Sequence, residues 1–152
     1  MPVAVEIAPV APEEFEELLP LIAAYQRFYE VEEIDEGRNR DFFRRFLSPS
    51  KDGLLLGARA EGRLLGYACL FWHFSSLQAE EVVLLNDLYV EEDARGRGVG
   101  RALIEAVAAV TRERGAPFVE WVTAPENHAA QRLYDSTGAE RSEWIAYELW
   151  VR

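Results

Sequence analysis

The sequence has very little cysteine and almost no lysine. Cys69 is the only cysteine, which excludes an internal disulfide and a zinc site built on several thiolates. Lys51 is the only lysine, so the other basic residues are arginines. Acidic residues outnumber basic ones by 27 to 16, which gives a net charge of −11. A nucleic-acid surface needs an excess of basic residues, so the composition disfavours a nucleic-acid partner.

Long apolar runs are also missing from the sequence. No stretch approaches the roughly 18 consecutive apolar residues of a membrane span. The first residues, MPVAVEIAPVAPEEFEE, lack the basic start and apolar run of a signal peptide. We therefore expect a cytoplasmic protein without a membrane partner. Its 152 residues, 49% hydrophobic and 28% charged, suit one globular domain over residues 1–152.

The hydrophobic pattern predicts strands and helices along the whole chain. Alternating or β-rich segments predict strands, and apolar residues three and four apart predict helices. Glu61-Gly62 between two β-rich segments is typical of a hairpin turn. This order indicates an α/β fold with a mixed sheet covered by helices. The expected strands are 3–8, 53–60, 63–74, 81–90, 118–123 and 141–151, and the expected helices are 12–29 with an interruption at Pro20, 40–47, 98–114 and 128–137.

A glycine-rich segment, RGRGVG at 95–100, lies between an expected strand and an expected helix. The first turn of a helix has N–H groups without intrahelical partners, and the helix dipole adds positive charge there. Glycine lets a phosphate approach these groups closely. Arg95, Arg97 and Arg101 would suit a pyrophosphate or a 3′-phosphate. The alternative is a tight turn in which the glycines only supply positive φ.

Two known phosphate loops fit this segment poorly. The dinucleotide pattern Gly-x-Gly-x-x-Gly needs a third glycine at position 101, which is Arg101. Glu120 lies at a plausible spacing for the ribose-binding acid, so a nucleotide-binding domain stays a weaker alternative. A P-loop needs Gly-Lys followed by Ser or Thr, and no lysine is near.

The pattern Arg-x-x-Gly-x-Gly, formed by Arg95, Gly98 and Gly100, resembles the acyl-CoA loop of the GNAT N-acetyltransferase superfamily. The later segment ENHAAQRLYDSTGA, residues 126–139, resembles the second element of that family, and the expected element order agrees along nearly the whole chain. The segments LLNDLYV, APFVEWVT and NHAAQRLYD look most like the histone and polyamine acetyltransferase branch, including the spermidine/spermine acetyltransferases. The resemblance implies a mostly antiparallel sheet of six to seven strands, about four helices, and a splay between the two central strands.

The resemblance also implies acetyl-CoA as co-substrate, without a metal. In the family the loop amides hold the pyrophosphate, the central strand pairs with the pantetheine arm, and an asparagine at the last helix contacts that arm. The corresponding residues here are Arg95, Arg97, Gly98, Val99, Gly100 and Arg101 for the loop, Leu88, Tyr89 and Val90 for the strand, and Asn127 for the helix.

Two residues are implied as catalytic. Tyr134 matches the tyrosine that protonates the departing thiolate, and the chemistry needs such a group because the leaving thiolate must gain a proton. Asp87, on the central strand, is the first choice for the general base. Asn86 stands where the spermidine/spermine enzymes carry a glutamate, and an amide cannot take a proton. Proton removal through water to Glu120, or by His73, therefore stays an alternative.

In this superfamily the first two helices and their connection form the acceptor side. Tyr25, Tyr29 and Glu33 lie in that region here, and Glu120 is a further candidate for contact with the substrate. Aromatic faces and carboxylates suit a cationic amine, which predicts a polyamine, a lysine-like amine or a basic peptide. The alternative is a solvated acidic face. Trp144 and Trp150 in the last expected strand suit either a homodimer surface or the core.

Three functions follow from these observations. The first is an acetyl-CoA-dependent amine N-acetyltransferase that transfers the acetyl group directly in a ternary complex. The second is a non-catalytic acyl-CoA-binding or sensing module of the same fold. The third is a nucleotide-binding domain.

Overall fold

The computed structural model describes residues 4–152, which form two compact units. One unit ends at Val122, and the other runs from Thr123 to Arg152. The sheet and the helices α1, α2 and α3 belong to the first unit, and helix α4 belongs to the second. Each unit is described by itself.

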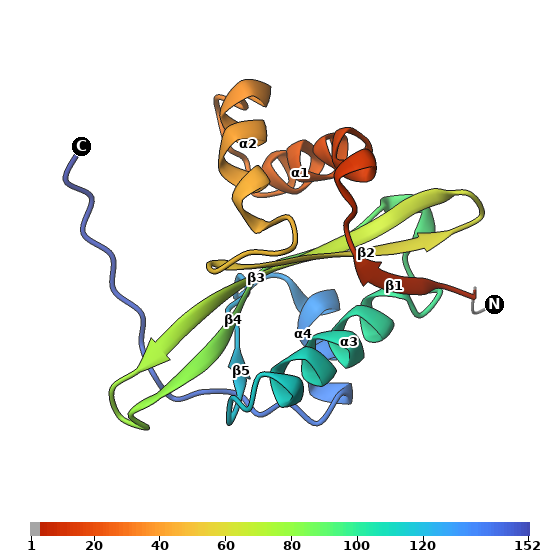
Figure 1. Cartoon of the computed structure of the whole chain (residues 1–152). Coiled ribbons are helices and arrows are strands. Elements are labelled where there is room, and N and C mark those ends of the chain that lie inside the picture. Colours follow the sequence, from red (N-terminus) through yellow and green to blue (C-terminus); the bar gives the residue numbers. More distant parts are fainter. Residues whose placement is uncertain (1–3) are drawn as a thin grey trace. The chain divides into compact units, whose positions relative to one another are not determined.

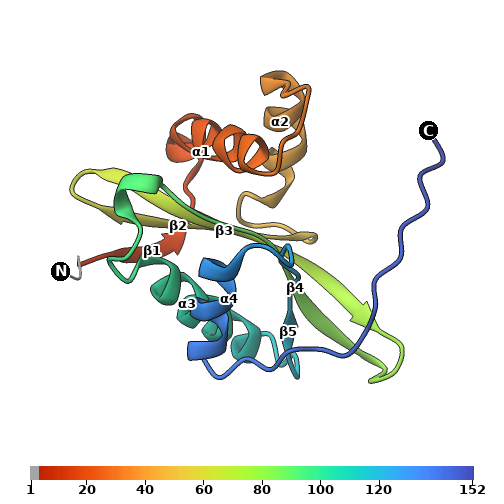
Figure 2. The ribbon, with the colours of Figure 1, turned by 180° about the vertical axis from the view of Figure 1, so that it is seen from behind.

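The first unit contains one five-stranded sheet with the strands in sequence order (Figures 1 and 2). Neighbouring strands are antiparallel, except for the last pair, β4 and β5, which is parallel. The prediction of a mixed, mostly antiparallel sheet is confirmed. The strands are β1 (Glu6–Pro9), β2 (Gly53–Ala60), β3 (Arg63–Ser75), β4 (Glu80–Val90) and β5 (Val119–Glu120), and the α-helices are α1 (Phe15–Phe28), α2 (Glu36–Phe43), α3 (Val99–Glu113) and, in the second unit, α4 (His128–Ser136).

Helices cover both faces of the sheet in the first unit. Helices α1 and α2 lie on one face, and α3 lies on the other (Figures 1 and 2). The alternation of side chains along each strand explains the two layers. Tyr67 and Cys69 of β3 pack into the cluster under α1, whereas Ala68 and Leu70 pack under α3. Each strand therefore supplies both halves of the core.

Helix α1 runs without interruption through Pro20. The sequence predicted a kink or two shorter helices at this residue, and the helix is not divided in two. Proline removes one backbone donor from a helix. The apolar stripe still packs, because Leu18 and Ile22 are fully buried while Pro20 is exposed. The helix that was expected over 40–47 begins earlier, where Asp35 caps α2 by accepting a hydrogen bond from the Arg38 amide at 3.0 Å.

The hairpin turn between β2 and β3 has the predicted geometry. Glu61 has φ of 55° and Gly62 has φ of 78°. Positive φ at both central residues is characteristic of the two-residue turn whose twist matches that of paired strands. The turn therefore confirms the hairpin prediction.

Two predicted strands differ from the structure. The strand expected over 118–123 is paired only at Val119 and Glu120. The segment 141–151 forms no strand, so the described residues give five strands instead of six to seven. Alternation alone does not make a strand, because its backbone groups need a partner strand. Large apolar side chains of this segment are exposed: Trp144, Ile145, Tyr147, Leu149, Trp150 and Val151. Residue 3 of the first expected strand lies outside the described residues.

Candidate active site

The glycine-rich segment forms the turn that leads into helix α3. Gly96 and Gly98 have φ of 76° and 86°, in the left-handed region that favours glycine. Gly98 is the N-cap residue, and no side chain caps the helix. A Cβ added at Gly98 would meet no atom within 4 Å, so space is open beside the helix start. Uncapped first-turn amides, the positive end of a 15-residue helix and this open space fit an anionic group such as a pyrophosphate.

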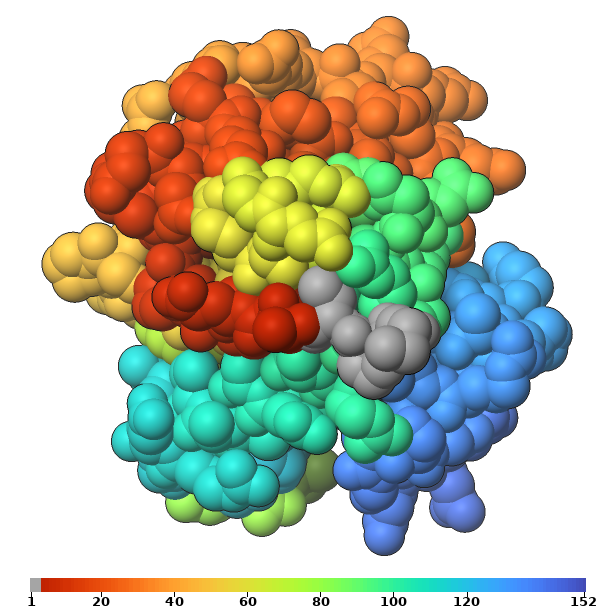
Figure 3. Space-filling view, turned by 90° about the vertical axis from the view of Figure 1, so that its right-hand side faces the viewer, coloured from red at the N-terminus to blue at the C-terminus, as the bar shows by residue number. Residues whose placement is uncertain are grey.

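Two arginines of the segment contact other parts of the protein. The Arg97 guanidinium lies 2.7 Å from the Glu61 carboxylate at the tip of the β2–β3 hairpin. The space-filling view shows the yellow hairpin tip beside the green segment that leads into α3 (Figure 3). The Arg95 Nε donates to the Val90 carbonyl at 2.9 Å, and its guanidinium lies over the rings of Tyr89 and Phe28. The backbone amides are therefore the part of this segment that best fits a phosphate.

Asp87 is the most deeply buried acidic side chain of the site, at 4% exposure. The Tyr67 hydroxyl donates to its Oδ2 at 3.1 Å, and the Asn86 side-chain amide donates to its Oδ1 at 2.7 Å. Burial raises the pKa of Asp87 to about 6, although both hydrogen bonds lower it. A carboxyl group with a pKa near neutral pH is suited to accept a proton during catalysis.

A β-bulge in β4 places Asp87 on the α1 face of the sheet. Asp87 pairs with Cys69, and the next pair along the ladder is Leu85 with Leu70, so Asn86 has no partner residue. An extra residue in one strand shifts the direction of the side chains that follow it. Asp87 and Tyr89 thereby lie on the same face as Tyr67, while Asn86 itself is exposed.

Four tyrosines, from α1, its C-cap, β3 and β4, form an aromatic wall that contacts Asp87 through Tyr67. Tyr25 is at its centre: its ring centroid lies 5.1 Å from that of Tyr29 and 6.3 Å from those of Tyr67 and Tyr89. The Tyr25 hydroxyl also donates to the Asn86 carbonyl at 3.4 Å. The fold thus connects the predicted substrate residue Tyr25 with the partners of the predicted base, and Tyr29 packs on Tyr25.

The edge of β4 is open beyond Leu84. Strands β4 and β5 pair only at Val83 with Val119 and at Leu84 with Glu120. In the first unit, the following part of β4 pairs with β3 alone. The predicted cofactor residues Leu88, Tyr89 and Val90 lie in this part, which corresponds to the expected splay. Unpaired backbone groups at such an edge can accept an extended ligand as an added strand.

Other predicted residues lie at the periphery of the first unit. Glu120 is exposed on β5, and Glu33 is exposed on the segment between α1 and α2. His73 is exposed near the end of β3, where it pairs with Val82. None of these three side chains is buried, whereas Asp87 is. Asp87 is therefore the better candidate for the base.

The second unit contains the predicted residues Asn127 and Tyr134. The Asn127 side chain accepts a hydrogen bond from the Ala130 amide at 3.2 Å and so caps α4, a role for which asparagine is among the preferred residues. Tyr134 is half-buried in the last part of that helix. The αL conformation of Gly138, with φ of 89°, follows the helix end.

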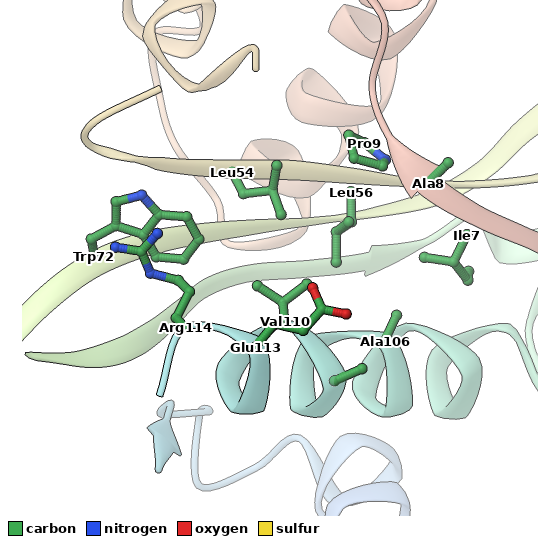
Figure 4. Close-up of a pocket in the computed structure, with 11 residues that line it drawn as sticks. Ile7, Ala8, Pro9, Leu54, Leu56, Trp72, Ala106, Val110, Glu113 and Arg114 are labelled. Carbon is green, nitrogen blue, oxygen red and sulfur yellow. The ribbon is translucent and has the colours of Figure 1, made fainter. Parts of the chain in front are cut away.

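A concave region lies between α3 and the strands β1 and β2 (Figure 4). It has a volume of about 370 Å³ and includes Trp72 and Arg114, whose guanidinium lies 3.7 Å from the Trp72 ring centroid. None of the predicted site residues lines it. The groove is therefore separate from the Asp87 site.

Residues 4–152 contain no group of three or more His, Cys, Asp or Glu side chains that could hold a metal ion. Within the same range, no helix has both the length and the apolar character needed to cross a membrane.

Comparison with known proteins matches residues 18–139 to the acetyltransferase (GNAT) family. The chain belongs to this family. The prediction of a GNAT N-acetyltransferase that uses acetyl-CoA is thereby confirmed at the level of the family. The narrower resemblance to the histone and polyamine branch stays a prediction.

Individual relatives agree with this membership. The D-amino-acid N-acetyltransferase HPA3 of Saccharomyces cerevisiae is 43% identical over 108 residues, which are 70% of this chain and 66% of that protein. A thialysine N-epsilon-acetyltransferase of Bos taurus is 29% identical over 77 residues, 51% of this chain and 45% of that protein.

Solved structures show the same fold. The crystal structure of a probable acetyltransferase is 32% identical, has a TM-score of 0.83, and covers 98% of both chains. The aminoglycoside N-acetyltransferase AAC(6')-Iy in complex with CoA has a TM-score of 0.85 at 19% identity, over 100% of this chain and 98% of that one.

Tyr67 is the main site residue that the sequence analysis did not identify. It lies 20 residues from Asp87 in the sequence. The two side chains come into contact only because β3 pairs with β4 in the observed register. Alternation in the segment RLLGYACLFWHF could have placed Tyr67 and Cys69 on one face of the strand. The bulge that turns Asp87 to the same face has no comparable signal in the sequence.

Proposed function

We propose that this protein transfers the acetyl group of acetyl-CoA directly to a primary amine in a ternary complex. The buried carboxyl group of Asp87 carries the proposal. It lies next to the aromatic wall, on the strand that leads into the glycine-rich turn of α3. Strand β4 thus connects the proton acceptor Asp87 with the turn before α3 that suits an anionic cofactor.

The residues around the turn are suited to hold the cofactor. The backbone amides of residues 97–101 would face its pyrophosphate. The open strand edge at Leu88, Tyr89 and Val90 would pair with its pantetheine arm, and Asn127 would contact the same arm. Acetyl-CoA, when bound, supplies the acetyl group as a thioester. The uncapped start of α3 and the left-handed Gly98 support this assignment. A protein of the same fold, AAC(6')-Iy, has been solved in complex with CoA, which supports CoA as the ligand.

Asp87 is proposed as the general base. A primary alkyl amine has a pKa near 10.4, so it carries a proton at neutral pH that must be removed before it can attack. A carboxyl group with a pKa of about 6 is largely ionised at pH 7 and can take that proton. Tyr134 is proposed to donate a proton to the departing thiolate. A phenol, with a pKa near 10, keeps its proton for this step.

Among the three predicted acceptor classes, a lysine-like amine is the proposed one. Such an acceptor carries a cationic amine, which suits the aromatic wall, with Glu33 and Glu120 as further candidate contacts. It also carries a carboxylate. The exposed guanidinium of Arg95 lies over Tyr89 at the edge of that wall, and it forms no ion pair with an acidic residue in the range 4–152. The names of the relatives that act on D-amino acids and on thialysine support this class.

A panel of amines tests the function. Acetyl-CoA is incubated with lysine, ornithine, spermidine and basic peptides, and the release of free CoA thiol is followed. We expect release that depends on the amine, with higher kcat/KM for the amino acids than for spermidine. Tight CoA binding without turnover on any amine would support the non-catalytic acyl-CoA module. A rise in melting temperature with NAD or ATP, but not with CoA, would support a nucleotide-binding domain.

The homodimer expected from the sequence remains a proposal. The exposed apolar residues of 141–151 are its support. Sedimentation equilibrium of the full chain tests it, and a monomer at micromolar concentration would contradict it.

A further inference from the structure

Both oxygens of the Asp87 carboxylate are held by neighbouring side chains. The Tyr67 hydroxyl donates to one at 3.1 Å, and the Asn86 amide donates to the other at 2.7 Å. The two donors differ in their surroundings. Tyr67 is fully buried at 0% exposure, whereas Asn86 is exposed. If the Tyr67 hydroxyl is removed, water cannot readily take its place as a hydrogen-bond donor to Asp87, whereas water can reach the position of Asn86.

We propose that Tyr67 is the positioning residue for Asp87: its buried hydroxyl orients the carboxylate and stabilises the ionised form that accepts the proton of the amine. This inference rests on the proposed role of Asp87 as the general base. Tyr67 acts through Asp87. It is the fully buried member of the aromatic wall, so in this scheme the more exposed Tyr25 and Tyr29 contact the amine and Tyr67 does not.

The groups that face Asp87 leave Tyr67 as its buried hydrogen-bond donor. Strand β3 contributes Tyr67 and Cys69, and strand β4 contributes Asn86. Helix α1 contributes Tyr25, whose hydroxyl is directed to the Asn86 carbonyl. Burial is the main cause that raises the pKa of Cys69 well above its usual value, and the negative charge of Asp87 adds to it. The thiol therefore stays neutral beside the carboxylate. No cationic side chain forms an ion pair with Asp87 in the range 4–152.

Tyr67 itself is a poor alternative base. Burial and the adjacent Asp87 carboxylate raise the pKa of Tyr67 well above that of an ordinary tyrosine. The hydroxyl therefore keeps its proton over the whole working pH range and remains a donor. Its role differs from that of Tyr134, for which proton release is proposed.

The test uses Tyr67→Phe, which removes only the hydroxyl, in steady-state assays with lysine from pH 5 to 9. Without this donor the ionised carboxylate is less stable, so the acid limb of kcat/KM should move to higher pH by about one unit. At pH 6 this gives roughly a fivefold loss, which approaches tenfold at pH 5 and becomes small above pH 8. The ionisation of the amine is common to both proteins, so the difference reports a group of the enzyme.

Thr111→Val is the matched control. It removes another buried hydroxyl, which donates to the Val107 carbonyl at 2.8 Å within α3 and has no contact with Asp87. This variant should keep the pH profile of the wild type. An equal shift in both variants, or no shift in Tyr67→Phe, would overturn the positioning role.

A double-mutant cycle separates this inference from the proposed function. If Tyr67 acts only through Asp87, adding Tyr67→Phe to Asp87→Asn should cause less than a twofold further loss of kcat, because residues that act as a unit are not additive. A full additional loss would contradict the inference while leaving Asp87 as the base. If Asp87→Asn instead turned over as fast as the wild type, the role of Asp87 as the base would be contradicted.

Discussion

The Tyr25 hydroxyl in α1 donates a hydrogen bond to the Asn86 carbonyl in β4 at 3.4 Å, across 61 residues of sequence. Asn86 is the bulged residue of β4, and its side chain holds Asp87. This contact joins Tyr25, at the centre of the proposed acceptor wall, to the strand that carries the proposed base. The two functions are therefore linked by one short chain of contacts.

Replacing Tyr25 tests the acceptor wall. Tyr25→Leu removes the aromatic face and should raise KM for lysine by about threefold to thirtyfold, the range expected for a cation–π contact. Tyr25→Phe keeps that face and should change KM much less. Steady-state kinetics measure both, and calorimetry should show unchanged CoA affinity. Equal KM values for the two variants would exclude a cation–π role for this ring.

Gly98 tests the cofactor turn. Gly98→Ala places a Cβ in open space but forces a left-handed residue, at a cost to stability of about 1–2 kcal/mol. Gly98→Glu adds a negative charge to the same strain, and it should weaken CoA binding much more than the alanine variant. Calorimetric titration with CoA gives both dissociation constants. Similar affinities for the two variants would show that no phosphate lies near this position.

Tyr134 tests the proposed proton donor. Tyr134→Phe should lower kcat by about a hundredfold, the lower range for loss of an acid catalyst, with little change in CoA affinity. Stopped-flow measurement of thiol release follows the affected step. Wild-type turnover in this variant would remove the assignment.

Asp87 also makes stability depend on pH. Its pKa is raised to about 6 in the folded protein from a usual value of 3.8, so the folded state holds the proton more tightly. The contribution of Asp87 to the free energy of unfolding therefore falls as pH rises from about 4 to about 6. Glu14 and Glu17 act in the opposite direction, because their hydrogen bonds lower their pKa values.

Asp87→Asn isolates this effect. Relative to the wild type, it should become more stable with rising pH, by up to about 2–3 kcal/mol at pH 7. Urea unfolding at pH 4.5 and pH 7.5 measures the difference. A difference that does not change with pH would mean that Asp87 has an ordinary pKa.

Local sequence signals predicted the parts of the fold that depend on local chemistry. The Glu61-Gly62 turn, the cap of α4 by Asn127 and the left-handed glycine before α3 all follow from residue types at fixed spacings. The element order up to α4 could be predicted for the same reason. Asp87 could be identified as a candidate because it lies on the central strand, next to the expected splay.

Features that depend on distant contacts could not be predicted. The burial of Asp87 depends on a bulge and on a tyrosine from another strand. The motif led us to expect the Arg95 side chain near the phosphates, but its guanidinium lies over the rings of Phe28 and Tyr89. The motif does not specify the direction in which this side chain points. The apolar pattern of 141–151 predicted a strand, yet a strand requires a partner that its own sequence does not specify.

Thiol release with lysine, measured for the wild type and for Asp87→Asn at pH 7.5, is the most direct test of this account. We expect the wild type to release CoA only when the amine is present. Asp87→Asn should bind CoA normally and release it at least a hundredfold more slowly. Equal rates for the two proteins, or no release by the wild type with any primary amine, would contradict amine acetylation with Asp87 as the base.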